Sequence, residues 1–225
     1  MKISCVVPSA GKGKRLKGKK EKPFIDIRNR PLFLHTVKAL EGCSLIDEII
    51  VVVSPRHLKA CKGLLKKYRC KKVTGVLPGG RYRFDSVKNG LKAVKEADII
   101  LIHDGARPFV NSSLIKRVIN GVKKYGAALC ATPSRQTLKT VNRNSVIVET
   151  PKRKFIWEAQ TPQGFRADLI KKAYKTSKDR LATDDSLLVE RLGHKVKIVK
   201  GSCRNIKITT PEDLLLAKAI LDYRP

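Results

Sequence analysis

Short, nearly continuous apolar runs alternate along the chain with longer segments that mix apolar and charged positions. The apolar runs are rich in Val and Ile, which is typical of parallel strands buried on both faces of a sheet. We expect strands at 3–7, 48–53, 72–77, 99–103, 127–132 and 195–200. The segments between them predict helices at 31–41, 55–68, 83–95 and 112–124. This alternation predicts an α/β fold with a Rossmann-like, mostly parallel open sheet and helices on both faces.

The alternation of strand and helix patterns is interrupted between residues 136 and 160. A polar turn at 142–145 separates two β-like segments, 137–141 and 146–149, so we expect a β-hairpin that projects from the sheet. Helical patterns return at 167–176 and 184–192, and a final helix begins at Thr210, where Thr and Pro suit the first positions. The pattern contains no repeat or linker. We therefore predict a single domain over 1–225, with 136–155 as a protruding arm used for dimerisation.

Composition narrows the class of protein. The chain has 225 residues, of which 42% are hydrophobic, so it can bury a real core and is not globally disordered. No apolar run approaches the roughly 18 residues that span a bilayer, and the N-terminal run is too short for a secretory signal. The six cysteines form no C-x-x-C pair, which favours reduced structural thiols. We expect a cytoplasmic protein with no membrane partner.

The net charge of +30 is unusually high. An excess of this size attracts polyanions, so a basic nucleic-acid-binding protein is the alternative from another functional class. However, the cations are spread along the whole chain, and aromatic residues, which stack on bases, make up only 5% of it. We interpret most of the charge as solvated surface and expect no specific nucleic-acid partner.

A basic, glycine-rich loop directly follows the first predicted strand. Residues 8–22 read PSAGKGKRLKGKKEK, with seven Lys and Arg between positions 12 and 22. Glycines let the backbone N–H groups approach an anion closely, and the cations neutralise its charge. Leu16 stands where a G-x-G-x-x-G motif needs its third glycine, and the spacing of a Walker A loop is absent. The loop indicates a nucleotide or sugar-phosphate enzyme, although a solvated lysine-rich loop would have the same composition.

Two further segments lie where ligands of open α/β sheets bind, beyond the carboxyl ends of strands. Asp104 ends a predicted strand and suits a carboxylate that holds Mg²⁺ or a ribose hydroxyl, or one that only caps a turn. The double-glycine turn at 79–80 enters a helix that carries Ser86, and its polar groups could contact the edge of a base. His103 points to the opposite face from Asp104, so we expect it to be packed and hydrogen-bonded rather than catalytic.

Together with the segments 161–163, 183–185 and 205–213, these motifs resemble the cytidylyltransferases that activate sugar-alcohol phosphates. The chain is most similar to the 2-C-methyl-D-erythritol 4-phosphate cytidylyltransferase family, from Ile3 to the final helix. The resemblance implies a nucleotide-diphospho-sugar transferase type of fold and a homodimer. It also implies transfer of CMP from CTP to methylerythritol phosphate in non-mevalonate isoprenoid precursor synthesis, with Mg²⁺ or another divalent cation.

The resemblance also assigns roles to residues. The family's P-A-A-G-x-G-x-R stands at 8–15 with Ser9 in place of the first Ala, and D-A-A-R-P stands at 104–108 with Gly105. The transition-state cations correspond to Arg15 and Lys22, although Lys22 here lies between Glu21 and Pro23 rather than in the usual P-K-Q. The implied CTP-binding residues are Ser9, Ala10, Gly11, Gly13, Gly80, Ser86, Asp104 and Gly105.

The acceptor side is implied in the same way, with Asp104 as the candidate metal ligand. The implied acceptor-binding residues are Arg107, Thr137, Arg153, Thr161 and Lys207, of which Arg153 and Lys207 are also catalytic. The nearest alternative is a ribitol 5-phosphate cytidylyltransferase, but that family opens L-A-G-G-x-G-T-R-M and carries A-V-R-P. For Asp184 and Asp185 the resemblance implies a structural role near the acceptor site.

Overall fold

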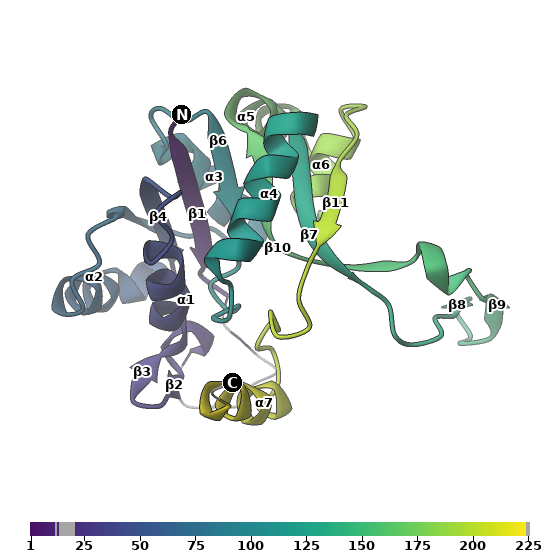
Figure 1. Cartoon of the computed structure of the whole chain (residues 1–225), viewed down its shortest axis with the longest axis horizontal. Helices are drawn as coiled ribbons and strands as arrows, with labels where there is room; N and C mark the ends of the chain where they lie inside the picture. Colours follow the sequence, from purple (N-terminus) through teal and green to yellow (C-terminus); the bar gives the residue numbers. More distant parts are fainter. Residues whose placement is uncertain (12, 14–20, 224–225) are drawn as a thin grey trace.

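The computed structural model of the chain describes residues 1–11, 13 and 21–223 and is built on a seven-stranded sheet (Figure 1). The strand order is β11-β7-β10-β6-β1-β4-β5. Every neighbouring pair is parallel except those of β10, which runs antiparallel to β6 and β7. The strands are β1 (Ile3–Ser9), β4 (Glu48–Val53), β5 (Val73–Pro78), β6 (Ile99–Ile102), β7 (Ala127–Pro133), β10 (Trp157–Arg166) and β11 (Lys197–Lys200). The predicted mostly parallel open sheet is confirmed.

Strand β10 was not among the predicted strands. Its burial would lead one to expect an apolar run, yet its central positions are Gln160, Thr161, Pro162 and Gln163. These polar side chains are buried because they meet hydrogen-bond partners from distant parts of the chain. A pattern of apolar positions therefore gives no signal for this strand.

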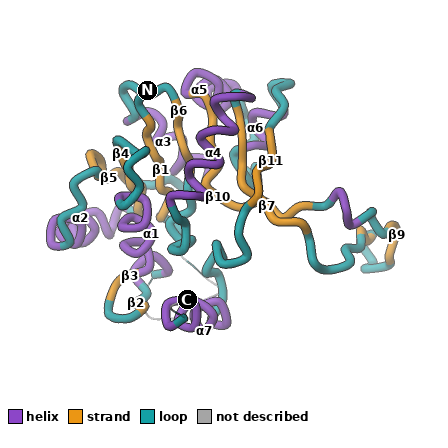
Figure 2. The backbone as a smooth tube through the Cα atoms, viewed as in Figure 1, coloured by secondary structure: helices purple, strands orange, loops and turns teal. Residues whose placement is uncertain are grey.

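Helices cover both faces of the sheet, as expected (Figure 2). One apolar cluster packs α1 (Leu32–Glu41), α2 (Leu58–Lys67) and α4 (Ser112–Tyr125) on one face. A second cluster packs α3 (Arg83–Ala93), α5 (Ala167–Thr176) and α6 (Ser186–Glu190) on the other. The last helix, α7 (Pro211–Asp222), packs on a smaller cluster below the carboxyl ends of the strands, next to β2 (Asp26–Ile27) and β3 (Arg30–Pro31). No helix within the described ranges is long and apolar enough to cross a bilayer.

A hairpin arm extends away from the sheet between β7 and β10 (Figure 1). Its two short strands, β8 (Thr140–Val141) and β9 (Ile147–Glu149), pair antiparallel, and Asn142 closes the turn by accepting the backbone N–H groups of Asn144 and Val146. The arm exposes an unusual number of large apolar side chains. They are Leu138, Val141, Val146, Ile147, Val148 and Phe155, and the exposed Trp157 follows them at the start of β10.

All six cysteines are free thiols, and Cys5, Cys43, Cys61 and Cys130 are buried. This agrees with the structural role expected for them. Burial raises the pKa of Cys5, Cys61 and Cys130 well above the usual value, so these thiols stay protonated and unreactive near neutral pH.

Candidate active site

A cavity of about 360 Å³ opens at the carboxyl ends of β1 and β6. Its size is within the range of about 300–1,000 Å³ that small-molecule sites occupy. The walls come from four parts of the sequence that are far apart: 8–11 and 13 with 22–23, 80–83 with 86, 104–106, and 207 with 209. This is the edge of the sheet, beyond the carboxyl ends of strands, where the sequence placed Asp104 and the start of the basic loop.

All eight residues assigned to CTP by resemblance line this cavity, and so do Lys22 and Lys207. Lys22 begins a 3₁₀ turn at Lys22–Phe24 directly beside Gly13. Gly13 has a positive φ of +64°, and a Cβ there would overlap the Lys22 side chain, so only glycine allows this approach. Arg15 lies outside the described residues. Its role stays a prediction.

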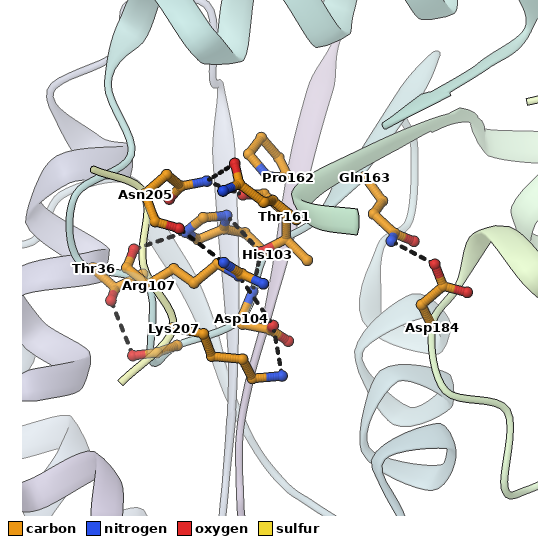
Figure 3. A network of polar contacts seen from close by, with 12 residues as sticks. Thr36, His103, Asp104, Arg107, Thr161, Pro162, Gln163, Asp184, Asn205 and Lys207 are labelled. Atoms are coloured by element: carbon orange, nitrogen blue, oxygen red, sulfur yellow. Dashed lines mark hydrogen bonds and ion pairs between the residues drawn. The ribbon is translucent and has the colours of Figure 1, made fainter. Parts of the chain in front are cut away.

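The Asp104 carboxylate has three cations as neighbours, two of which, Arg107 and Lys207, are labelled in Figure 3. Lys207 Nζ lies 2.9 Å from its Oδ2, while the Arg83 and Arg107 guanidinium groups approach its oxygens to 3.5 Å. Burial alone would raise the pKa of Asp104, but the nearby Arg83, Lys207 and Arg107 charges lower it well below its usual range. Asp104 is therefore ionised at any physiological pH.

Below Asp104, buried hydrogen bonds hold the loop that follows β6, and we call the residues that form them, His103, Arg107, Thr161 and Asn205, the floor of the cavity. The Asp104 backbone N–H donates to Thr161 Oγ1 at 3.0 Å, and the same hydroxyl lies 3.1 Å from His103 Nδ1. His103 Nε2 lies 3.0 Å from the Arg107 carbonyl, which can only accept. Nε2 must then carry the proton, and Nδ1 accepts from Thr161. Burial lowers the pKa of His103 to about 4, so the ring is neutral and structural, as expected from the sequence.

Arg107 and Thr161 belong to this floor and not to the cavity wall. Both are buried, and Arg107 Nη1 donates to the Asn205 carbonyl at 2.8 Å. Asn205 Nδ2 in turn donates to the Thr161 carbonyl at 2.8 Å, which ties the segment carrying Lys207 to β10 (Figure 3). The two side chains that the resemblance assigned to the acceptor thus serve as internal anchors here. Direct contact with an acceptor stays a prediction.

The remaining acceptor residues, Thr137 and Arg153, are exposed on the arm. Arg153 begins a 3₁₀ turn at Arg153–Phe155, and its Nη1 donates to the Arg135 carbonyl at 3.3 Å. Neither side chain lines the cavity of its own chain. The structure therefore brings Lys207 to the predicted site but leaves the arm residues apart from it.

The resemblance places Arg83 between Gly80 and Ser86 but assigns it no role, and the structure shows that it lines the cavity and contacts both Asp104 and Asp185. Its place at the start of α3, directly after the glycine turn, was the one available signal, because the first residues of a helix border the ligand in such sites. Its partner Asp185 is 102 positions away in the sequence. No local pattern reveals that pair.

The cavity suits a metal ion that arrives with phosphates better than one held by protein alone. Asp104 is the one carboxylate among the lining residues within the described part of the chain, and no group of three potential metal-binding side chains occurs there. Mg²⁺ is commonly held by one or two carboxylates, with substrate phosphates and waters as its other ligands. A single ionised aspartate fits that arrangement.

Ser9 and Gly105 face each other across the end of β1. A Cβ on Gly105 would overlap Ser9 Oγ, and the Gly105 N–H donates to the Pro8 carbonyl at 3.2 Å. The Ser9 hydroxyl is buried and has no hydrogen-bond partner among the described residues. Glycine at 105 therefore leaves room for the Ser9 hydroxyl where it lies, so the two departures from the family's Ala residues in these motifs fit each other.

The comparisons with known proteins agree over almost the whole chain. The family model IspD, described as 2-C-methyl-D-erythritol 4-phosphate cytidylyltransferase, matches residues 3–223. The enzyme of that name from Alkaliphilus metalliredigens is 44% identical over 227 residues, with 99% of this chain and 94% of the relative covered. The one from Syntrophus aciditrophicus is 45% identical over 224 residues, with 98% and 96% covered.

Solved structures give the same result. The 4-diphosphocytidyl-2C-methyl-D-erythritol synthase of Anaerococcus prevotii superposes with a TM-score of 0.87 at 34% identity and covers 99% of this chain and 96% of its own. The cytidylyltransferase of Thermus thermophilus gives a TM-score of 0.81 at 31% identity, with 99% and 100% covered. Motif order, cavity, fold and relatives thus agree, and the chain belongs to the 2-C-methyl-D-erythritol 4-phosphate cytidylyltransferase family.

Proposed function

We propose that the cavity binds CTP and that the chain transfers CMP from it to 2-C-methyl-D-erythritol 4-phosphate. The products are 4-diphosphocytidyl-2-C-methyl-D-erythritol and pyrophosphate, within isoprenoid precursor biosynthesis. The observation that carries the proposal is the convergence of the motif residues, Lys22 and Lys207 on one cavity at the carboxyl ends of the strands. The family match, which spans residues 3–223, supports the same reaction.

The chemistry requires positioning and charge more than a protein nucleophile. An oxygen of the acceptor phosphate attacks the α-phosphorus of CTP, and both reactants are anions. Negative charge grows on the α-phosphate oxygens in the transition state, so fixed cations lower the barrier. Lys22 takes this role in our proposal, together with Arg15. Lys207 would hold the attacking phosphate as a point charge.

We assign Asp104 as the protein ligand of a divalent cation such as Mg²⁺ carried by the CTP phosphates. The ion would neutralise phosphate charge as a Lewis acid. Asp104 is suited to this because its pKa is lowered well below the usual range, which leaves a carboxylate ready to bind. In the structure that carboxylate pairs with Lys207, so the incoming cation and Lys207 compete for it.

We propose a homodimer in which the arm of one copy completes the acceptor side of the other. Two observations support this assembly. The arm exposes six large apolar side chains, a concentration that marks interaction surfaces. It also carries Thr137 and Arg153 outside the cavity of its own chain. We further expect the protein in the cytoplasm, where free thiols stay reduced.

A pyrophosphate-release assay tests the reaction. CTP, UTP, ATP and GTP are each offered with methylerythritol 4-phosphate or ribitol 5-phosphate in the presence of Mg²⁺, and reactions without acceptor serve as blanks. We expect rapid release from CTP with methylerythritol phosphate and little from the other combinations. Equal use of ribitol phosphate would contradict the proposed acceptor. Release without any acceptor would contradict group transfer.

A further inference from the structure

The guanidinium of Arg83 lies between two carboxylates and is held mainly by the more distant one in sequence. Arg83 forms a bidentate ion pair with Asp185, in which Arg83 Nη1 lies 2.8 Å from Asp185 Oδ1 and Arg83 Nη2 lies 2.7 Å from Asp185 Oδ2. Asp104, in the cavity, is 3.5 Å away from the same group. Planar forks of this kind fix the orientation of an arginine as well as its position.

Asp185 is itself immobilised. It is fully buried, and Tyr174 donates its hydroxyl to Oδ1 at 2.5 Å. The backbone N–H groups of Asp185 and Ser186 both donate to Gln163 Oε1, at 3.1 and 3.0 Å. Gln163 belongs to β10 and pairs with Ile102, the last residue of β6. The carboxylate is therefore anchored to the sheet that carries the cavity.

The ring next to Arg83 strengthens this connection. Phe84 stacks on Tyr174 with ring centroids 4.7 Å apart, so the start of α3 is packed against α5 at the same point. Burial, and then the Asp185 charge, raises the pKa of Tyr174 far above its usual value. Its hydroxyl therefore remains a donor to Asp185 at every physiological pH.

Without Asp185, the guanidinium would have an ionised acceptor within 3.5 Å in Asp104. Arginine forms bidentate pairs with carboxylates wherever geometry allows. Arg83 would then close on Asp104, which would remove a cation from the cavity wall and occupy the carboxylate assigned to the metal ion. Asp185 opposes this movement of Arg83, because a buried carboxylate that loses its cationic partner is strongly destabilising.

We propose that Asp185 is a positioning residue for nucleotide binding, which acts through Arg83 by holding its guanidinium on the cavity wall, at 3.5 Å from Asp104, and preventing a closer bidentate pair with that carboxylate. The inference rests on the proposed function, since it takes the cavity to be the CTP site. It goes beyond that function because neither Asp185 nor Tyr174 lines the cavity.

The test compares two neighbouring acids that support the same turn. Asp185→Asn keeps the size of the side chain but weakens the pair with Arg83. The control is Asp184→Asn, because Asp184 accepts from Gln163 Nε2, Ser186 and the Leu187 N–H but does not contact Arg83. Calorimetry measures the Kd for CTP with Mg²⁺ and without acceptor, steady-state kinetics gives KM and kcat, and thermal unfolding gives Tm.

We expect both variants to lower Tm, and only Asp185→Asn to weaken CTP binding. A lost charged hydrogen bond corresponds to about a tenfold to hundredfold rise in Kd and in KM for CTP. We expect kcat at saturating CTP to change little, because Arg83 would hold the nucleotide in the ground state and the transition state alike. Equal CTP affinity in the two variants would overturn the proposal.

Arg83→Lys keeps the argument testable if Asp185→Asn does not fold. Lysine retains the charge but cannot form the fork with Asp185, so we expect a similar rise in Kd with a smaller loss of Tm. Wild-type affinity in Arg83→Lys would contradict the inference. Failure of the proposed function gives a different result, because the wild-type protein itself would then bind no CTP.

Discussion

The floor of the cavity and the hairpin arm differ in where their polar and apolar groups find partners. In the floor, His103, Thr161 and Asn205 join segments that lie 44 to 58 positions apart, and all three are buried. In the arm, hydrogen bonds such as Lys139 to Thr150 are local, and the large apolar side chains face solvent. In the proposed function, the chain builds its nucleotide side from its own segments, whereas the acceptor side includes Thr137 and Arg153, which one chain does not bring to the cavity.

The largest effect should come from removing a cation that the chain supplies to its own cavity. Lys22→Ala should lower kcat by about 10²–10³-fold, because one fixed charge at the transition state is lost. CTP affinity should fall much less, as measured by calorimetry. Lys62→Ala, an exposed lysine on α2, is the matched control and should be unaffected. A near-normal kcat in Lys22→Ala would break the assignment of the nucleotide side, and Arg15→Ala tests the same assignment.

The stability of the floor should also depend on pH, whereas the stability of the arm should not. The pKa of His103 is lowered to about 4 in the folded protein, while the unfolded chain takes up a proton near its ordinary value of 6.5. Stability is therefore fully present above pH 6.5 and is lost as pH falls toward 4, by on the order of 3 kcal/mol for this group. Urea unfolding between pH 7 and 4.5 measures the change.

The matching variant is His103→Gln, which cannot titrate. We expect it to be less stable than wild type at pH 7 but to have a flatter pH dependence. The comparison between variants is needed because burial also lowers the pKa of His35. An unchanged slope in His103→Gln would show that the floor does not depend on a neutral imidazole. Hydrogen exchange should then locate the acid-sensitive opening at 103–107 and not in the arm.

The smallest effect is expected from a substitution in the arm, and this substitution tests the comparison between the floor and the arm most directly. Arg153→Ala should raise KM for the acceptor phosphate about tenfold to hundredfold, as expected for one charged hydrogen bond, while KM for CTP changes little. Mixing Arg153→Ala with Lys22→Ala subunits should restore partial activity, because one cavity then has its own Lys22 and a neighbour's intact arm. If mixed preparations stay inactive, the arm does not serve a second copy.

The strands and helices that were predicted from the sequence are those that a pattern of neighbouring residues marks. Apolar runs mark β1, β4, β5, β6, β7 and β11, and Thr210 caps α7 as expected, with its hydroxyl accepting from the Asp213 N–H. β10 was missed because Gln160, Thr161 and Gln163 are buried by virtue of partners far along the chain. Periodicity shows which positions are apolar. It does not show which buried polar side chains will find hydrogen-bond partners.

The same limit explains how much of the site could be predicted from the sequence. Loops at strand ends are visible as motifs, and the resemblance that these motifs carry assigned the cavity residues from Ser9 to Gly105 to one site. The motif that contains Arg107 does not reveal that its side chain turns inward to Asn205. The contact between Arg83 and Asp185 joins positions 102 apart, and only the folded chain brings them together. Motifs therefore locate a site better than they assign the task of each side chain in it.

The contact between Ser9 and Gly105 restricts the order in which these two positions can change. Alanine at 105 would overlap the hydroxyl of Ser9 where it now lies, so from a pair of alanines the overlap is avoided when the glycine arises before the serine. On the way back to two alanines, the overlap is avoided when the serine changes first. The contact therefore links the two positions in both directions, and a serine placed at 9 opposite an alanine would meet a different neighbour from the one it has here.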